Sequence, residues 1–327
     1  MKVVEVITRE GHIEAVRRLA RESGASDHWL GPVNEDERQA VRILISPEHR
    51  QQLLDALQAR LGSSEESRIL VYPLEIALPR SEETDESSGS QGAVTTREEL
   101  YNEIHAGTRL DGTFLLLVFL STIVATIGLL ENNPAVIIGA MVIAPLLGPN
   151  LALALGTALG DSRLMWQAFK TGVSGLSLAL IISVAIGKLW PSVSYSHEVL
   201  SRTEAGLDTI ALAFASGAAA VISLTTGLSS VLVGVMVAVA LLPPTAVIGM
   251  MIGQGEWQLA YGATLLLLIN IVSVNLAAKL VFMFKGVKPR TWLEKQQARQ
   301  SMMSYIFIWI LSLILLVTMI YVRQYIG

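Results

Sequence analysis

Cysteine is absent from this chain of 327 residues, and aromatic residues make up only 6% of it. A chain without cysteine forms no disulfide, no thiolate metal site and no thiol nucleophile. The five histidines, at positions 12, 28, 49, 105 and 197, lack the spacing of metal ligands, so we expect neither a metal nor a cofactor. The apolar part contains no serine–histidine–aspartate set, phosphate loop or carboxylate pair, so we expect no catalytic residues and no enzyme.

Charged residues are scarce in the last two thirds of the chain. Residues 1–110 hold 13 Lys/Arg and 20 Asp/Glu, whereas residues 111–327 hold 11 and 8 and contain every long apolar run. The acidic part is unsuited to nucleic acid, because it has too little positive charge to neutralise phosphates. The apolar part is expected to lie in a lipid bilayer. The charged N-terminus has no signal-peptide core, so we expect the acidic part in the cytoplasm.

The acidic part alternates strand and helix patterns. Strands are predicted at 2–9, 29–33, 40–46 and 68–78, and helices at 11–23 and 47–61. This βαββαβ order predicts a small α+β domain of ferredoxin-like fold over residues 1–80. The polar segment 81–95 is predicted to be a disordered linker, and 96–109 a juxtamembrane helix that begins with a capping box.

Seven apolar segments are long enough to cross a membrane. Their approximate limits are 113–130, 134–159, 168–189, 209–226, 230–253, 259–283 and 302–322. With the N-terminus inside, nine Lys/Arg flank the spans on the cytoplasmic side and three on the other. The sequence therefore predicts an inner (plasma) membrane protein with its N-terminus in the cytoplasm and its C-terminus outside.

Residues 119–161 recur as residues 214–256 at a constant offset of 95, with 13 of 43 positions identical. Each copy belongs to a set of three spans, and because three is odd the second set enters the membrane from the opposite side. We expect a polytopic α-helical domain with a 3+3 inverted repeat plus one span. Its parts are repeat 1 at 110–189, an outer loop at 190–208, repeat 2 at 209–284, a basic cytoplasmic loop at 285–300 and the seventh span at 301–327.

The second span of each repeat is interrupted by proline and glycine. Proline frees backbone groups that, in hydrocarbon, protein or water must satisfy. Two such breaks predict half-helices that line a path for a substrate or ion; packed kinks without function are the alternative. The sixth span adds two asparagines, which are either ligands or links between helices. The candidate path residues are Pro145, Gly148, Pro149, Asn150, Pro243, Pro244, Thr245, Asn270 and Asn275. Asn150 and Thr245 are equivalent in the repeat and are expected to face each other.

No Asp, Glu, His or Arg lies near the middle of a predicted span, which argues against a carboxylate proton relay. Lys170 and Lys279 lie near span ends, where we expect their ammonium groups to reach the lipid headgroups. Small residues at Gly172, Gly175 and Gly187 in the third span favour packing against a second copy, so we expect a homo-oligomer.

The motif GAMVIAPLLGPNLALALGTALGD, residues 139–161, resembles the bacterial and archaeal membrane family named domain of unknown function 389. The resemblance covers about residues 96–283, and a preceding small domain is usual in that family. It implies this architecture but no activity and no site.

Two functions from different classes fit these features. The first is a transport protein: a channel or uncoupled carrier for a small solute or ion, regulated by the N-terminal domain. The alternative is a membrane-anchored sensor or scaffold that acts through residues 1–80. Symmetric breaks favour the first, because a plain anchor has no need of them.

Overall fold

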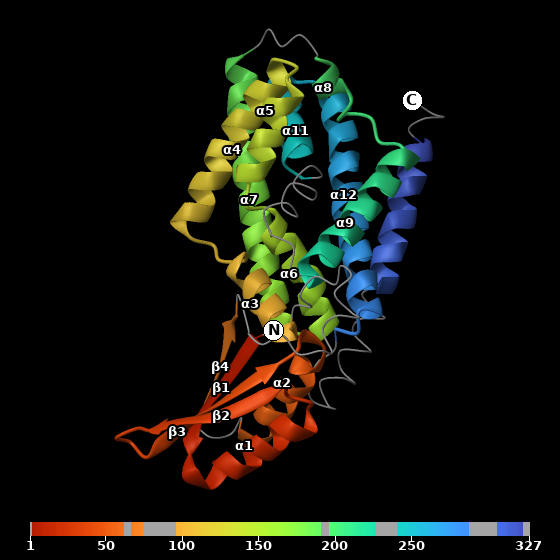
Figure 1. The fold of residues 1–327 in the computed structure, drawn as a ribbon. Coiled ribbons are helices and arrows are strands. Elements are labelled where there is room, and N and C mark those ends of the chain that lie inside the picture. The colour runs from red at the N-terminus through yellow and green to blue at the C-terminus, as the bar shows by residue number, and fades with distance from the viewer. Residues whose placement is uncertain are drawn as a thin grey trace. The chain divides into compact units, whose positions relative to one another are not determined.

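The computed structural model describes residues 2–61, 67–74, 96–190, 196–226, 241–287 and 306–322. The chain divides into two compact units, Met1–Arg97 and Glu98–Gly327. Each unit is described by itself below, and Figure 1 gives the labels of the helices and strands.

The first unit is a four-stranded antiparallel sheet with two helices. Its elements are β1 (Lys2–Arg9), α1 (Glu10–Glu22), β2 (Asp27–Val33), β3 (Arg38–Ile45), α2 (Pro47–Leu61) and β4 (Arg68–Pro73). The strands are ordered β2-β3-β1-β4, and each neighbouring pair is antiparallel. Alternate residues of β1, Val4 and Val6, are fully buried in one core with Val16 and Leu53 of the two helices. The βαββαβ order predicted from the sequence is the order found. Residues 75–78 of the predicted fourth strand and the linker 81–95 lie outside the described residues.

The second unit is a bundle of apolar helices. Its elements are α3 (Arg97–Ala106), α4 (Gly112–Leu130), α5 (Pro134–Ile143), α6 (Leu147–Leu159), α7 (Ser162–Leu189), α8 (His197–Leu200), α9 (Leu207–Thr225), α11 (Leu242–Gln254), α12 (Trp257–Phe284) and a C-terminal helix (Ile306–Val322). Because α3 begins at Arg97, that one residue belongs to the first unit.

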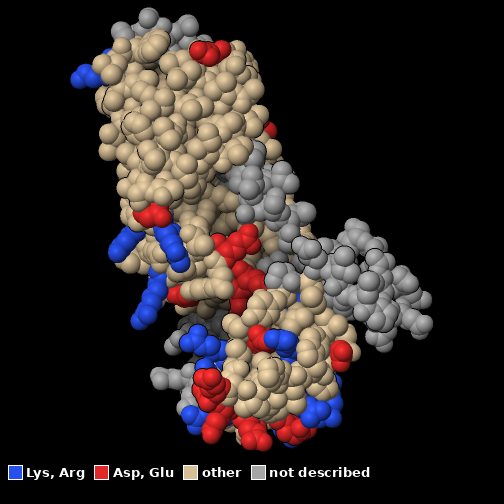
Figure 2. Space-filling view, turned by 60° about the vertical axis from the view of Figure 1, so that its left-hand side comes forward, with Lys and Arg blue, Asp and Glu red and all other residues tan. Residues whose placement is uncertain are grey.

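Four of these helices, α4, α7, α9 and α12, are long and apolar enough to cross a membrane. The pair α5 and α6, bent by 55°, makes a fifth candidate. On the face shown in Figure 2, a broad surface of this unit is almost free of charged side chains. The apolar helices therefore indicate a membrane location. Residues 230–240 of the predicted fifth span (230–253) and residues 288–300 of the predicted basic loop (285–300) lie outside the described residues, and the described C-terminal helix, Ile306–Val322, has 17 residues.

The helix bounds recur at the offset found in the sequence. Adding 95 to the bounds of α4 (112 and 130) gives those of α9 (207 and 225), and the same shift relates α6 to α11 and α7 to α12. Both α6 and α11 end at a glycine in the left-handed conformation, Gly160 with φ 71° and Gly255 with φ 81°. Glycine adopts this conformation without steric cost. The duplication therefore includes the left-handed backbone conformation of the glycines that end these two helices.

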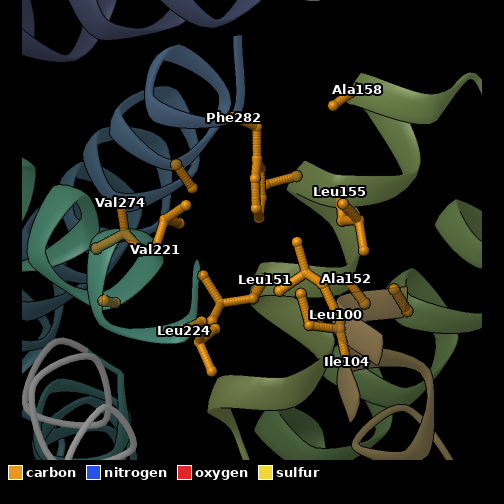
Figure 3. Packing of buried hydrophobic residues seen from close by; sticks show 14 of the residues in the cluster. Leu100, Ile104, Leu151, Ala152, Leu155, Ala158, Val221, Leu224, Val274 and Phe282 are labelled. Carbon is orange, nitrogen blue, oxygen red and sulfur yellow. The ribbon is translucent and has the colours of Figure 1, made fainter. Parts of the chain in front are cut away.

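Equivalent helices run in opposite directions. One cluster of buried side chains joins α3 and most of α6 to the later part of α9, the C-terminal part of α12 and the start of α7. Figure 3 shows Leu155, Leu224 and Phe282 pointing into it from three of these helices. A second cluster joins the end of α4 and most of α11 with the start of α12. So α7 begins where α12 ends, and α4 and α9 end on opposite sides of the unit.

The small residues of α7 are used for packing inside the chain. A Cβ added to Gly175 would lie 2.9 Å from Leu146 Cδ2, and one on Gly187 would lie 2.7 Å from the Cα of Met250. These two glycines let α7 approach α6 and α11 closely. The expectation that they face a second copy is therefore wrong for Gly175 and Gly187, while the homo-oligomer itself stays a prediction.

Candidate functional site

The break between α5 and α6 follows from the proline at position 145. A residue that precedes proline is held out of the helical region, and Ala144 is extended, with φ −69° and ψ 121°. Helix α5 therefore ends at Ile143, and α6 begins at Leu147 after a short turn. Pro149 lies in the first turn of α6, where no helical hydrogen bond needs its missing N–H. The break thus leaves fewer backbone groups unpaired than a proline in a helix interior would.

The second repeat places its prolines in the same way. Pro243 and Pro244 are buried in the first turn of α11. Thr245, which is 2% exposed, donates a hydrogen bond from Oγ1 to the carbonyl oxygen of Leu241 at 2.7 Å. Its hydroxyl is thereby paired within its own helix.

Asn150 on α6 contacts Asn275 on α12. The Asn275 amide Nδ2 donates to Asn150 Oδ1 and also to the Ile271 carbonyl at 3.2 Å. Two atoms of the pair, Asn150 Nδ2 and Asn275 Oδ1, are buried and have no hydrogen-bond partner in the described part of the chain. The structure thus joins two predicted site residues 125 positions apart. The side chain that Asn150 contacts belongs to α12, whereas Thr245 is bonded within α11.

Asn270 does not belong to this contact. It is 6% exposed and lies on α12 five residues before Asn275. Five residues correspond to about 140° around a helix, so the two side chains leave α12 on different faces.

A cavity of about 250 Å³ lies beside the break. Of the predicted residues, Pro149 and Asn150 line it, with apolar side chains of α6 and α7, Ile271 of α12 and Trp309 of the C-terminal helix. Apolar walls with few polar groups are typical of small-molecule sites. Within the described ranges, no three His, Asp or Glu side chains are placed to hold a metal ion.

Lys279 is a buried amine, contrary to the expectation from the sequence. It is 1% exposed, and its Nζ lies 4.2 Å from the centre of the Trp309 ring. Among the residues that the structure describes, no carboxylate, carbonyl or hydroxyl oxygen pairs with this ammonium group. The expectation that Lys279 reaches the headgroups is wrong, because the C-terminal helix covers it. Lys170, by contrast, is exposed beside Trp166. The signal available in the sequence was spacing: Ile271, Asn275 and Lys279 follow at intervals of four, on one face of the helix.

Helix α3 is attached to the start of α6. A Cβ on Gly107, just after α3, would lie 3.1 Å from the Cα of Gly148, so the two backbones touch. The next carbonyl, that of Thr108, accepts a hydrogen bond from Thr171 Oγ1 at 2.8 Å. Gly148, predicted as a break residue, therefore serves as a contact point between α3 and α6.

The other end of α6 is tied to α3 by a tyrosine. The Tyr101 hydroxyl donates to Asp161 Oδ2 at 2.9 Å, and the other oxygen of Asp161 caps α7. Burial, and then this hydrogen bond, raise the pKa of the Tyr101 phenol above its ordinary value.

Comparison with known proteins supports the resemblance seen in the sequence. A family model described as domain of unknown function (DUF389) matches residues 141–276. An uncharacterised protein of Methanocaldococcus jannaschii is 33% identical over 282 residues, which are 86% of this chain and 87% of that protein. No solved structure matches the chain. The matched range includes Asn150 and Asn275 and ends before Lys279.

Proposed function

The chain belongs to the family named domain of unknown function 389, and we propose that it is a membrane transport protein, a channel or uncoupled carrier for a small solute or ion. The proposed path passes the break between α5 and α6. The observation that carries this proposal is the Asn150–Asn275 pair, which has two amide atoms without a partner among the described residues and borders the cavity through Asn150.

Unsatisfied polar atoms are costly in an apolar unit. Each buried donor or acceptor without a partner costs about 1–3 kcal/mol. A helix bundle that serves only as an anchor gains nothing from two such atoms at a bend. A passing solute or its water would meet their hydrogen-bonding needs.

The proposed architecture has seven spans, six of them in a 3+3 inverted repeat. The offset of 95 between helix bounds and the opposite directions of α7 and α12 support the repeat. The strand order supports a ferredoxin-like fold for residues 1–80. The flanking charges support an inner-membrane protein with its N-terminus in the cytoplasm and its C-terminus outside. We further propose a homo-oligomer without enzymatic activity.

Regulation by the N-terminal unit is part of the proposal. The chain enters the second unit through α3, and the turn after α3 rests on Gly148. A displacement of α3 therefore reaches the first turn of α6, which holds Pro149 and Asn150 at the cavity.

Flux through reconstituted protein tests the function. Purified full-length protein in liposomes is compared with empty liposomes over a panel of labelled small solutes and ions. We expect at least one to cross, and Asn150→Leu to slow it about tenfold or more, since a loss of about 1.4 kcal/mol corresponds to tenfold. The control, Thr318→Leu, changes an exposed position of the C-terminal helix. If no solute crosses, and deletion of residues 1–80 abolishes a cellular phenotype, the protein is a sensor or scaffold.

A further inference from the structure

We propose that this site binds small organic anions, held by the Lys279 ammonium and the Asn150 amide beside Trp309, and that these are the transported substrates. The second part rests on the proposed transport function; the binding site itself does not.

The burial of the Lys279 amine is the first argument. An ammonium taken out of water is expensive unless an opposite charge accompanies it. The face of Trp309, 4.2 Å away, offsets a part of that cost. Within the described residues no carboxylate supplies the rest. An anion bound at Nζ would supply it.

The arrangement of donors is the second argument. Asn275 lies one helical turn before Lys279 on α12. Its amide donates a hydrogen bond to the side chain of Asn150 on α6. Asn150 Nδ2 is an unused donor, and the ammonium group brings three N–H bonds. Within the pair of Asn150 and Asn275, the unused acceptor among the described residues is Asn275 Oδ1. Donors outnumber acceptors, so the polar side of the site suits a negatively charged ligand.

The walls of the cavity determine which uncharged part the ligand can have. Trp309 contacts Lys279 and also lines the cavity, so its ring lies beside both, while Lys279 itself is not among the residues that line the cavity. The remaining walls include Leu146, Leu153 and Leu176, which offer only hydrocarbon. A halide would leave these walls uncovered. We expect a carboxylate with a short aliphatic or aromatic body to lie with its body against the leucines and its charge beside Asn150 and the Trp309 ring, toward Lys279.

Three probes with the same six-carbon tail test the charge. Binding of hexanoate, hexanol and hexylammonium to the full-length protein in a neutral detergent is measured by calorimetry. We expect hexanoate to bind at least tenfold more tightly than the other two. Lys279→Met should weaken hexanoate binding tenfold or more, whereas Lys279→Arg, which keeps the charge, should retain most of it. Lys170→Met is the matched control, because Lys170 forms the same kind of contact with Trp166 at an exposed position.

The outcomes separate the site from the transport function. Equal binding of the three probes, or hexanoate binding that neither Lys279→Met nor Asn150→Ala weakens, overturns the site. If Lys279→Met does not fold, Asn150→Ala decides, with at least threefold weaker binding expected. Should hexanoate bind at Lys279 while no solute crosses the liposomes, the site stands and the transport function fails. Should other solutes cross while hexanoate does not bind, the reverse holds.

Discussion

Gly107 and Gly148 touch backbone to backbone, with room for no side chain between them. Gly107 follows the juxtamembrane helix α3, and Gly148 lies in the first turn of α6. The contact therefore joins the segment through which the chain enters the second unit to the turn of α6 that carries Pro149 and Asn150.

A methyl group at this contact should separate the two segments. We expect Gly148→Ala to destabilise the protein by about 1–3 kcal/mol, the usual cost of overpacking. Thermal unfolding in detergent measures the change. Gly139→Ala is the matched control, because a Cβ on Gly139 would meet nothing within 4 Å. It should be neutral or stabilising by up to about 1 kcal/mol, the advantage of alanine in a helix. Equal stability of the two variants would refute the contact.

The asparagine pair should behave as a coupled unit. Asn150→Leu or Asn275→Leu alone leaves the other amide buried without its partner, at a cost of about 1–3 kcal/mol. The double variant removes both polar groups and should cost less than the sum of the single changes, with a coupling of about 0.5–3 kcal/mol. Unfolding in mixed detergent and denaturant gives the four stabilities of the cycle. Additive effects would show that the two amides do not interact.

The cysteine-free chain allows a direct test of orientation. Glu131 and Ser201 are exposed at the end of the unit where α4 ends, and Ser162 and Lys285 are exposed at the opposite end. Single cysteines at the first two positions should react with an impermeant thiol reagent in intact cells. Those at Ser162 and Lys285 should react only after permeabilisation. Labelling of all four from outside would contradict the cytoplasmic placement of the N-terminus.

The Tyr101–Asp161 hydrogen bond should make stability depend on pH at the alkaline end. The folded-state pKa of Tyr101 is raised above its ordinary value of 10.0, so the folded protein holds this proton more tightly than the unfolded chain. The resulting stability is present below about pH 10 and is lost as the pH rises through the raised pKa. Tyr101→Phe should be less stable by about 1 kcal/mol at neutral pH. Thermal unfolding from neutral pH upward should show the difference from the unchanged protein shrinking above about pH 10. A constant difference would exclude the link.

The sequence predicted the repeat well because its signals are local. Proline at position 145, glycine at 160 and 255, and the apolar runs between them each specify backbone conformation at their own position. The helix bounds follow from these signals. In the first unit, period-two and period-3.6 patterns likewise predicted strands and helices in the right order.

The contacts of the site could not be predicted in this way, because they depend on residues far apart in the chain. Lys279 looks like a helix-end lysine until Trp309, 30 positions later, covers it. Gly187 looks free to face a neighbour until the backbone of Met250 occupies the space. The repeat also did not predict the hydrogen-bond partner of Asn150, which is Asn275 on α12, and whether Asn150 faces Thr245 stays a prediction.

The offset of 95 makes the two halves of the membrane unit comparable position by position, and the comparison is unequal where it concerns polar groups. Asn275 corresponds to Leu180, and Lys279 corresponds to Val184. The halves thus share a backbone plan, but the second half carries Asn275 and Lys279 where the first half has apolar side chains. If the two halves exchange conformations, the two end states have related backbone shapes. They differ in the polar side chains that each half contributes. In the proposed carrier, side-chain composition would therefore make the two end states unequal in free energy, even though their backbones are related, while net flux would still follow the gradient of the solute.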